Sequence, residues 1–384
     1  MPNKINYLRA LMIFILVTPF FEGVVQNFFF LLITLVSTLI FINYLRNTNF
    51  KISMSNKDIT AKLFISGLLI VSYAAINMII NGYSTDALIR LLQLYVSFTV
   101  LLASSKYMWN ISDYKFIIKA IQIIVVVCIV LWPLSGFIMN YYNALFTRGN
   151  ALGGALFCYM GIYLSIPRKY SKWDKIIIAL MLLLMYFANS RSAMVSMVVF
   201  LLIRFLFLRH KNWNRKYIIL VLVTIFTIFP YVYMMLYQSS FKDSLDAFSW
   251  LFLRKRFFSG RQYFWGILIE YINNKFLLGY GLGVTPETLL GITYSSHNWY
   301  LQILLQMGLI GFLLLVNVLR NIWNTLSKLG SKISANASAF IVGVLIWQCF
   351  EVSLTQNNYS IGILTWLVMG MGLNQHFQPQ NNSL

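Results

Sequence analysis

The sequence predicts an all-α, polytopic integral membrane protein with about twelve transmembrane helices and one large insertion late in the chain. Of the 384 residues, 59% are hydrophobic and only 10% are charged, which is not the composition of a soluble domain. Apolar runs of about 20 residues, the length that a helix needs to cross a bilayer, recur along the chain. The basic residues between these runs are unevenly distributed, which indicates the orientation.

Twelve apolar runs define the expected spans of a single integral domain, residues 1–384. They lie near residues 6–20, 26–45, 61–80, 87–103, 116–138, 150–166, 175–189, 192–208, 217–237, 298–319, 336–353 and 358–374. Segment 238–297, between the ninth and tenth spans, is the one long insertion, and the other connections have roughly 4–18 residues. The first run lacks a small-residue cleavage site, so we expect a retained helix.

The basic residues orient these spans. If the N terminus is cytoplasmic, 21 of the 30 Lys and Arg residues fall in segments on the cytoplasmic side. This bias follows the positive-inside rule, and it predicts that both termini are cytoplasmic and that segment 238–297 lies on the outer face. The basic residues are scattered over many segments, which argues against a nucleic-acid-binding surface.

Nine cations do not follow this bias and need another explanation. They are Arg90, Arg148, Arg191, Lys242, Arg254, Lys255, Arg256, Arg261 and Lys275, which lie in spans or on the outer side. The three cysteines all fall in apolar spans, so neither a disulfide framework nor a metal cluster is expected.

The insertion is amphipathic and contains one helix with a recognisable start, SGRQYFWGILIEYINNK. Ser259 at the N-cap and Gln262 three residues later predict a capping box. Glu270 recurs with Gln262 among the polar positions and is a candidate substrate contact. Such a helix would lie on the membrane surface or on the span bundle. The GYGLG that follows favours unusual backbone angles, either for close approach to a ligand or as an ordinary loop.

Two arginines are candidate phosphate ligands. Arg191 stands in the short seam between the seventh and eighth spans, where topology does not require a cation and an anionic partner would offset its cost. Arg261 falls in the first turn of the insertion helix, where free N–H groups and the helix dipole already favour anions and a guanidinium adds bidentate contacts. For both residues, the alternative is an arginine that reaches to lipid headgroups.

His297, one of three histidines, stands where the insertion enters the tenth span. Asn298, Gln302 and Gln306 follow at helical spacing and form a polar stripe on an apolar helix. An imidazole can accept a proton near neutral pH, so His297 is a candidate general base, with Asn298 and Gln302 as substrate contacts. The alternative is that His297 caps the helix and the amides bond to neighbouring helices.

Outer-face arginines beside a histidine fit one kind of chemistry. The arginines would hold an anionic leaving group while the base removes a proton from an incoming hydroxyl group. A lipid diphosphate is the anionic substrate that a membrane-embedded site meets. No cofactor is expected, since the departure of the diphosphate requires neither nucleotide nor metal in principle. The sequence also has no phosphate-binding loop motif, no zinc-ligand spacing and no GxSxG motif.

Local motifs between residues 148 and 311 resemble the O-antigen polymerase and O-antigen ligase family of bacterial inner membranes. These motifs are NSRSAM at Arg191, SGRQYFW at Arg261, LLGYGLG at 277–283 and HNWYLQILLQMGLIG from His297. The last one matches the family's H-N-x-x-L-x6-G pattern at His297, Asn298, Leu301 and Gly308.

The resemblance implies a GT-C-like fold and a metal- and nucleotide-independent, inverting glycosyltransferase at the periplasmic face. Its donor would be an oligosaccharide or polysaccharide on undecaprenyl diphosphate, and its acceptor would be a sugar hydroxyl group of another glycan. Arg191 and Arg261 would bind the diphosphate, and His297 would activate the acceptor. Arg148 resembles a further periplasmic arginine of the family. Membrane lipids and a chain-length regulator protein are the other implied partners.

Two activities share these motifs. A polymerase transfers the growing chain to a new lipid-linked repeat unit, whereas a ligase transfers the finished chain to lipid A-core. We favour a polymerase because the chain is short and because of its GYGLG-to-HN arrangement, although the H-N-x-x-L pattern favours a ligase. A membrane transporter is the alternative of another class, but transporters place polar groups near the midplane, whereas these cations gather at one face.

Overall fold

The computed structural model confirms the all-α class. It describes residues 4–21, 23–47, 59–107, 109–136, 142–146, 149–210, 217–253, 256–258, 260–291 and 295–374. No strand occurs in these ranges. The helices are α1 (Lys4–Val17), η1 (Thr18–Phe20), α2 (Gly23–Asn47), α3 (Ile59–Ile80), α4 (Thr85–Lys106), α5 (Ile111–Leu134), α6 (Gly149–Ser165), α7 (Lys172–Phe187), α8 (Arg191–Arg209), α9 (Ile218–Gln238), α10 (Lys242–Leu253), α11 (Arg261–Asn274), α12 (Pro286–Leu290), α13 (Trp299–Leu329), α14 (Lys332–Trp347) and α15 (Tyr359–Gly372).

Each of the twelve expected spans coincides with a helix, α1 to α9 and α13 to α15. Among the described residues, seven helices are long and apolar enough to cross a membrane, namely α2, α3, α4, α5, α8, α9 and α13. The other five, α1, α6, α7, α14 and α15, have 14 to 17 residues. The polytopic membrane character is therefore confirmed, and the count of twelve crossings stays a prediction.

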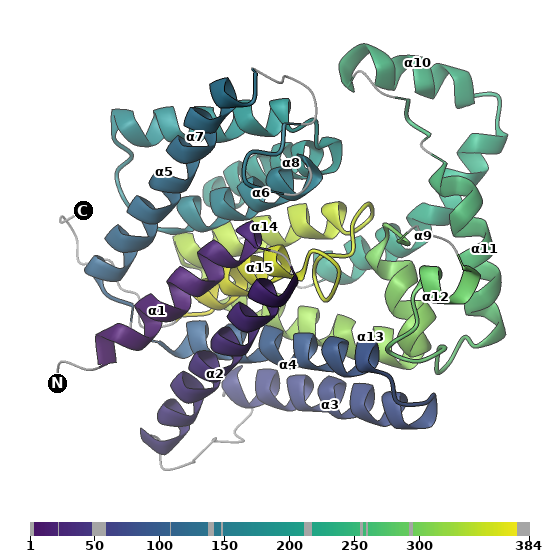
Figure 1. Cartoon of the computed structure of the whole chain (residues 1–384), viewed down its shortest axis with the longest axis horizontal. Coiled ribbons are helices and arrows are strands. Elements are labelled where there is room, and N and C mark those ends of the chain that lie inside the picture. The colour runs from purple at the N-terminus through teal and green to yellow at the C-terminus, as the bar shows by residue number, and fades with distance from the viewer. Residues whose placement is uncertain are drawn as a thin grey trace.

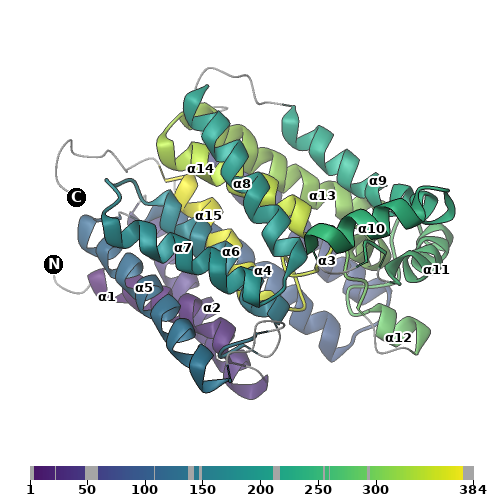
Figure 2. The same cartoon turned by 90° about the horizontal axis from the view of Figure 1, so that it is seen from above.

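Helices α6, α14 and α15 form the centre of the bundle, and the other helices surround them (Figures 1 and 2). Helix α14 packs against α8, and α15 packs against α4. Glycines allow the close approach: a Cβ at Gly154 would lie 2.4 Å from the Trp347 ring, and one at Gly161 would lie 2.5 Å from the Phe340 ring. Large rings fill the space that the glycines leave, which fixes the central helices against each other.

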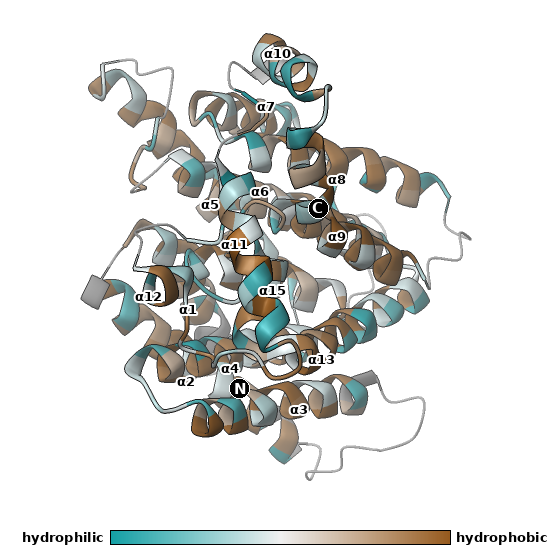
Figure 3. Cartoon of the chain, turned by 90° about the vertical axis from the view of Figure 1, so that its right-hand side faces the viewer, coloured by the Kyte–Doolittle hydropathy of each residue, from teal (hydrophilic) through white to brown (hydrophobic). Residues whose placement is uncertain are grey.

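The outer helices turn apolar side chains away from the bundle. Leu31 on α2, Ile79 on α3, Val130 on α5 and Met235 on α9 are each more than half exposed. In Figure 3, where the cartoon is coloured by hydropathy, brown marks many apolar positions along the outer helices. Contiguous apolar surface of this extent is costly in water and matches a hydrocarbon environment. The outer helices therefore form the lipid-facing belt of a membrane protein.

The bundle has two different ends. Arg9 on α1 forms an ion pair with Asp113 at the start of α5 at 3.2 Å, and Asn374 after α15 donates to the Tyr107 carbonyl at 2.6 Å. The beginning of α1 and the end of α15 therefore lie at one end, called the terminal end. Helices α10 to α12 lie at the opposite end, called the insertion end (Figure 1).

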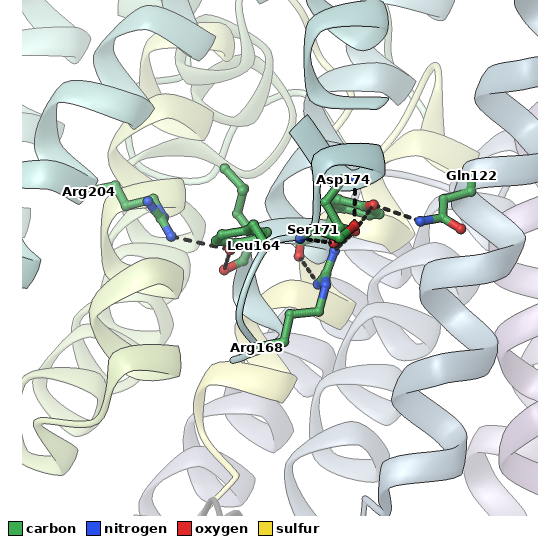
Figure 4. Close-up of polar contacts among 8 residues, drawn as sticks. Gln122, Leu164, Arg168, Ser171, Asp174 and Arg204 are labelled. Carbon is green, nitrogen blue, oxygen red and sulfur yellow. Dashed lines mark hydrogen bonds and ion pairs between the residues drawn. The ribbon is translucent and has the colours of Figure 1, made fainter. Parts of the chain in front are cut away.

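A buried polar cluster closes the turn between α6 and α7 at the terminal end (Figure 4). Arg168 forms an ion pair with Asp174 at 3.0 Å, and the Tyr163 hydroxyl donates to the same carboxylate. Ser171 caps α7 and donates its hydroxyl to Asp174 at 2.8 Å. Burial opposes ionisation of Asp174, but the hydrogen bonds from Tyr163, Ser171 and Arg168 outweigh it and lower the pKa of the carboxyl group.

Helix α13 is broken at Gly308, whose φ of +60° and ψ of −168° are not helical. Residues 276–281, called the clip, fill this break from outside the helix. Clip N–H groups donate to carbonyls before the break, and clip carbonyls accept from N–H groups after it. The bonds run from Tyr280 N to Leu305 O (2.8 Å), Gly281 N to Gln306 O (3.0 Å), Leu309 N to Phe276 O (2.8 Å) and Ile310 N to Leu277 O (3.3 Å).

The clip explains the glycine-rich motif. Inside a bilayer every backbone group needs a partner, and a helix break leaves several without one. Two α3 side chains complete the arrangement: the Tyr73 hydroxyl donates to the Met307 carbonyl at 2.8 Å, and the Asn77 amide donates to the Leu278 carbonyl at 2.7 Å. The glycines of the clip therefore serve close backbone contact with α13.

Helix α14 ends at Trp347, six residues before the expected end of its span at 353. Residues 348–358, called the connector, run non-helically to α15, and residues 348–349 and 351–356 of it are buried. The Gln348 amide donates to the Ser353 hydroxyl at 3.0 Å, and its carbonyl oxygen accepts from the Leu354 N–H at 3.2 Å. Irregular backbone at membrane depth is tolerated where the protein surrounds it. The connector brings Glu351 to the insertion end.

The insertion contains helices α10 to α12, and α11 packs on α9 and α13. Helix α11 begins at Arg261, but its N-cap is Gly260, with φ +87° and no side-chain cap. The expected capping box is therefore wrong: Ser259 lies outside the described residues, and Gln262 is the second residue of the helix and is buried. Gly260 provides the left-handed turn that a residue with a Cβ adopts only with strain.

Candidate active site

His297 immediately precedes the cap of α13 and has a left-handed backbone, φ +45°, which is uncommon for a residue with a side chain. Nδ1 of the imidazole lies 3.9 Å from Oε2 of Glu351. The His297 side chain is 36% exposed and that of Glu351 is 11% exposed, so an accessible imidazole is backed by a mostly buried carboxylate. Unusual backbone of this kind concentrates at functional positions, where the surrounding contacts hold it.

Hydrogen bonds on two sides hold the backbone around His297. One side is α11 and the other is the connector. The bonds run from Trp265 Nε1 to Ser296 O (2.8 Å), Asn298 Nδ2 to Cys349 O (3.1 Å) and Trp299 N to Gln348 O (2.9 Å). The position of the imidazole therefore depends on both α11 and the connector.

Arg261 opens α11, where the first N–H groups of the helix have no partner within it. Its guanidinium carbon lies 5.6 Å from the centre of the Phe350 ring. An arginine stacked over a ring keeps its in-plane N–H donors available for an anion. Phe350 is the chain neighbour of Glu351, so Arg261 and His297 contact adjacent residues of the connector.

Arg191 opens α8 and reaches the segment that leads into α11. Its Nη1 donates to the Arg256 carbonyl at 2.6 Å. Arg256 and Arg261 are five residues apart, so their Cα atoms lie within about 18 Å of each other. Arg191 and Arg261 therefore open two helices, and the hydrogen bond from Arg191 to Arg256 links the first helix to the segment that precedes the second.

Comparison with protein families gives one match. Residues 176–316 match the family model for O-antigen ligase. This match, over about a third of the chain, supports a relationship to the O-antigen polymerase and ligase family. The matched stretch contains Arg191, Arg261 and His297, and the family consists of glycosyltransferase-like enzymes that act on lipid-linked glycans. Comparison with curated proteins found no match.

The other expected site residues have different surroundings. Arg148 lies outside the described residues. Glu270 is exposed and follows Arg261 by nine residues, which puts it about 180° away around α11. Asn298 caps α13 by accepting from the Leu301 N–H at 3.0 Å. The Gln302 amide donates to the Val284 carbonyl at 3.3 Å, so the polar stripe contacts the segment that follows the clip.

Glu351 is the residue that sequence reasoning did not assign to the site. A signal existed, because it is an acidic residue within the expected span 336–353, and ionisable groups within spans usually have a function. What the sequence did not provide was its partner, since residues 297 and 351 approach only through the non-helical connector. Among the described residues, no three His, Cys, Asp or Glu side chains gather closely enough to hold a metal ion.

Proposed function

We propose that this protein is an O-antigen polymerase of the bacterial inner membrane. It transfers an oligosaccharide or polysaccharide from undecaprenyl diphosphate to a sugar hydroxyl group of another lipid-linked repeat unit. The site faces the periplasm and both termini are cytoplasmic. The observation that supports the proposal is that Arg261 contacts Phe350 and His297 contacts the next residue, Glu351. A base beside guanidinium groups is what glycosyl transfer from a diphosphate requires.

Arg261 and Arg191 bind the diphosphate in this mechanism. Each of them opens a helix, and the free backbone N–H groups and the positive end of the dipole at a helix start also favour an anion. A diphosphate leaves readily once its charge is neutralised, and two guanidinium groups neutralise it through bidentate contacts without a metal ion. Arg148 is a proposed further contact to the substrate. We do not retain Glu270, because it faces away from Arg261.

His297 acts as the general base through Nε2. The Glu351 carboxylate on the Nδ1 side favours the tautomer that carries its proton on Nδ1, which leaves the Nε2 lone pair for the acceptor. The acceptor oxygen bonds to the anomeric carbon opposite the diphosphate and gives its proton to His297. The bond from that carbon to the diphosphate oxygen breaks, the electron pair leaves with the diphosphate, and the configuration inverts.

Glu351 stabilises the charged imidazole that this step creates. The proton then passes from His297 to water or to the departing diphosphate, and the base is restored. A positioned general base contributes roughly 10²–10⁴-fold to a rate, and the guanidinium groups supply the electrostatic part.

An O-antigen ligase is the second candidate, and the description of the matched family favours it. The donor, the base and the leaving group are the same in both reactions. Only the acceptor differs, because a ligase delivers the finished glycan to lipid A-core. A polymerase would additionally meet a chain-length regulator protein.

The lipopolysaccharide ladder of a chromosomal replacement strain tests the proposal. We expect His297→Ala and Arg261→Ala to abolish polymer while the protein stays in the membrane. His210→Ala and Arg209→Ala are matched controls, because both residues lie at the far end of α8 from Arg191. The controls should keep the full ladder.

The glycan that accumulates in the inactive variants also distinguishes a polymerase from a ligase. One repeat unit on the core indicates a lost polymerase, whereas bare core with polymer left on its lipid carrier indicates a lost ligase. A full ladder in the His297→Ala strain would remove His297 from the mechanism.

A further inference from the structure

Helix α10 turns its apolar side away from the protein. Leu251 is 73% exposed and Phe248 is 65% exposed, and Trp250, which lies about 40° around the helix from Asp246, is 58% exposed. Toward the protein, Ser249 is buried and the Asp246 carboxylate accepts from the Phe258 N–H at 3.0 Å. At about 100° per residue, Leu251 lies about 140° around the helix from Asp246 and about 160° from Ser249. This is the reverse of a surface helix that packs its apolar side on a core and presents its polar side to water.

A short connection ties α10 to the end of a membrane-crossing helix. Helix α9 is long and apolar enough to cross a membrane and ends at Gln238, and α10 begins at Lys242. Those two positions are at most about 14 Å apart along the chain. The Lys242 ammonium group also lies 4.7 Å from the centre of the Tyr237 ring, the residue before the end of α9. The start of α10 is therefore held where α9 leaves the membrane.

The direction of α10 also fits a membrane boundary. Figure 2 shows α10 running across the direction of α8 and α9 instead of continuing it. Phe241, in the connection between α9 and α10, is 64% exposed, and Met235, near the end of α9, is 71% exposed. Exposed apolar side chains of α9 are thus followed by exposed Phe241 and then by those of α10, with exposed Gln238 and Ser240 between them.

Basic residues flank α10 in the sequence. Lys242 is its first residue, and Arg254, Lys255 and Arg256 follow its last one directly. Exposed leucine and tryptophan beside several cations are typical of a helix at a bilayer surface. The apolar side chains enter the acyl-chain boundary, and Lys242 and the exposed Arg256 remain beside anionic headgroups.

We propose that α10 docks on the lipid bilayer, with the Leu251 side in the acyl-chain boundary and the flanking cations at anionic headgroups. The bilayer is favoured over a protein partner because the exposed surface continues from α9 and because its borders are cationic. The docking is connected to the site: α10 holds the Phe258 N–H through Asp246, and Arg191 holds the Arg256 carbonyl two residues earlier. Helix α10 thereby sets the height of the site relative to the headgroups. This inference does not depend on which reaction the site catalyses.

The test measures the immersion of two positions on α10 in the full-length protein. Leu251→Cys and Asp243→Cys are each labelled with a nitroxide in vesicles of phosphatidylethanolamine and phosphatidylglycerol. Asp243 is the matched control, because it is exposed on the same helix but polar. The native Cys128, Cys158 and Cys349 are buried, and the unsubstituted chain measures their background labelling. Neither position is in the proposed catalytic machinery.

We expect the label at 251 to collide several-fold more with oxygen, relative to a water-soluble nickel chelate, than the label at 243. An equal ratio at both positions would overturn the proposal. Protection of position 251 from both reagents, with spin–spin broadening that depends on protein density, would indicate a second copy of the chain and would also overturn it. If Leu251→Cys fails to fold, Phe241→Cys provides the same comparison.

The role of the cations is tested in the same experiment. Replacing phosphatidylglycerol with phosphatidylcholine removes the anionic headgroups, and the label at 251 should then become measurably shallower. An unchanged depth would contradict the electrostatic part of the proposal.

Discussion

Replacing Gly279 by alanine should open the clip that completes the broken helix α13. Gly279 has φ +73°, and a Cβ there would lie 2.5 Å from the carbonyl carbon and oxygen of Gln306 and 2.6 Å from the nitrogen of Gly308. All three are backbone atoms, so no side-chain rotation can relieve the overlap. The clip must move away from α13, and the neighbouring N–H groups of Tyr280 and Gly281 lose their carbonyl partners.

The expected cost follows from these contacts. An alanine in the left-handed region costs about 1–2 kcal/mol. Two lost backbone hydrogen bonds add about 1 kcal/mol each. The sum is about 3 kcal/mol for Gly279→Ala. Gly291 is a matched control, because its φ is +64° but nothing lies within 4 Å of the added Cβ. Its substitution should cost only the backbone term, about 1 kcal/mol.

The assay is thermal unfolding of the detergent-solubilised protein, followed by intrinsic tryptophan fluorescence. At about 2 °C per kcal/mol, the apparent Tm should fall by about 6 °C for Gly279→Ala and by about 2 °C for Gly291→Ala. An equal loss in the two variants would show that close contact of the clip with α13 contributes nothing, and the explanation of the glycine motif would be wrong.

Three further predictions concern single side chains. Glu351→Gln should lower the rate of glycan transfer about 10–100-fold, because a charge 3.9 Å away stabilises the imidazolium of His297 by at most about 4 kcal/mol. Glu351→Asp should recover part of the rate. An unchanged pH–rate profile in Glu351→Gln would exclude a functional contact between Glu351 and His297. Arg191→Lys should slow transfer without reducing membrane abundance, because an ammonium group cannot make a bidentate contact, and a parental rate would exclude Arg191 as a phosphate ligand. Asp174→Asn should destabilise the protein by about 3 kcal/mol at neutral pH. Hydrogen bonds lower the pKa of this carboxyl group in the folded state, so its contribution to stability is present above the unfolded-state pKa of about 4 and is lost as pH falls toward the folded-state value. The Tm difference between parent and variant should therefore shrink below about pH 4. A Tm difference that does not change with pH would contradict a stabilising role for the Asp174 carboxylate.

Hydropathy was sufficient to locate the twelve helices that coincide with apolar runs, because a bilayer leaves the backbone few alternatives to a helix; α10 and α12 were not predicted. The break at Gly308 was not predictable. Glycine is compatible with both a helix and a break, and the outcome depends on the clip, about 30 residues earlier in the chain. The end of α14 at Trp347 could not be predicted from the sequence either. The following residues are apolar enough to continue a span, and it is contacts from Asn298 and Trp299 that hold them out of the helix.

The candidate site residues were selected from the sequence where charge departed from topology. Arg191 and Arg261 attracted attention because the positive-inside rule does not explain them, and His297 because it follows the insertion. The capping box failed because Ser259 and Gln262 have the right spacing, but the turn is made by Gly260. Glu351 was missed because its proximity to His297 is a product of tertiary structure.

The most direct test of the central claim is a transfer assay in proteoliposomes with a defined undecaprenyl-diphosphate-linked repeat unit, without nucleotide and with a chelator present. The measured quantity is undecaprenyl diphosphate released together with lengthened glycan. We predict that the parent protein and His210→Ala release both products, and that His297→Ala and Arg261→Ala release neither. Turnover by His297→Ala at the parental rate would contradict a base at the insertion end.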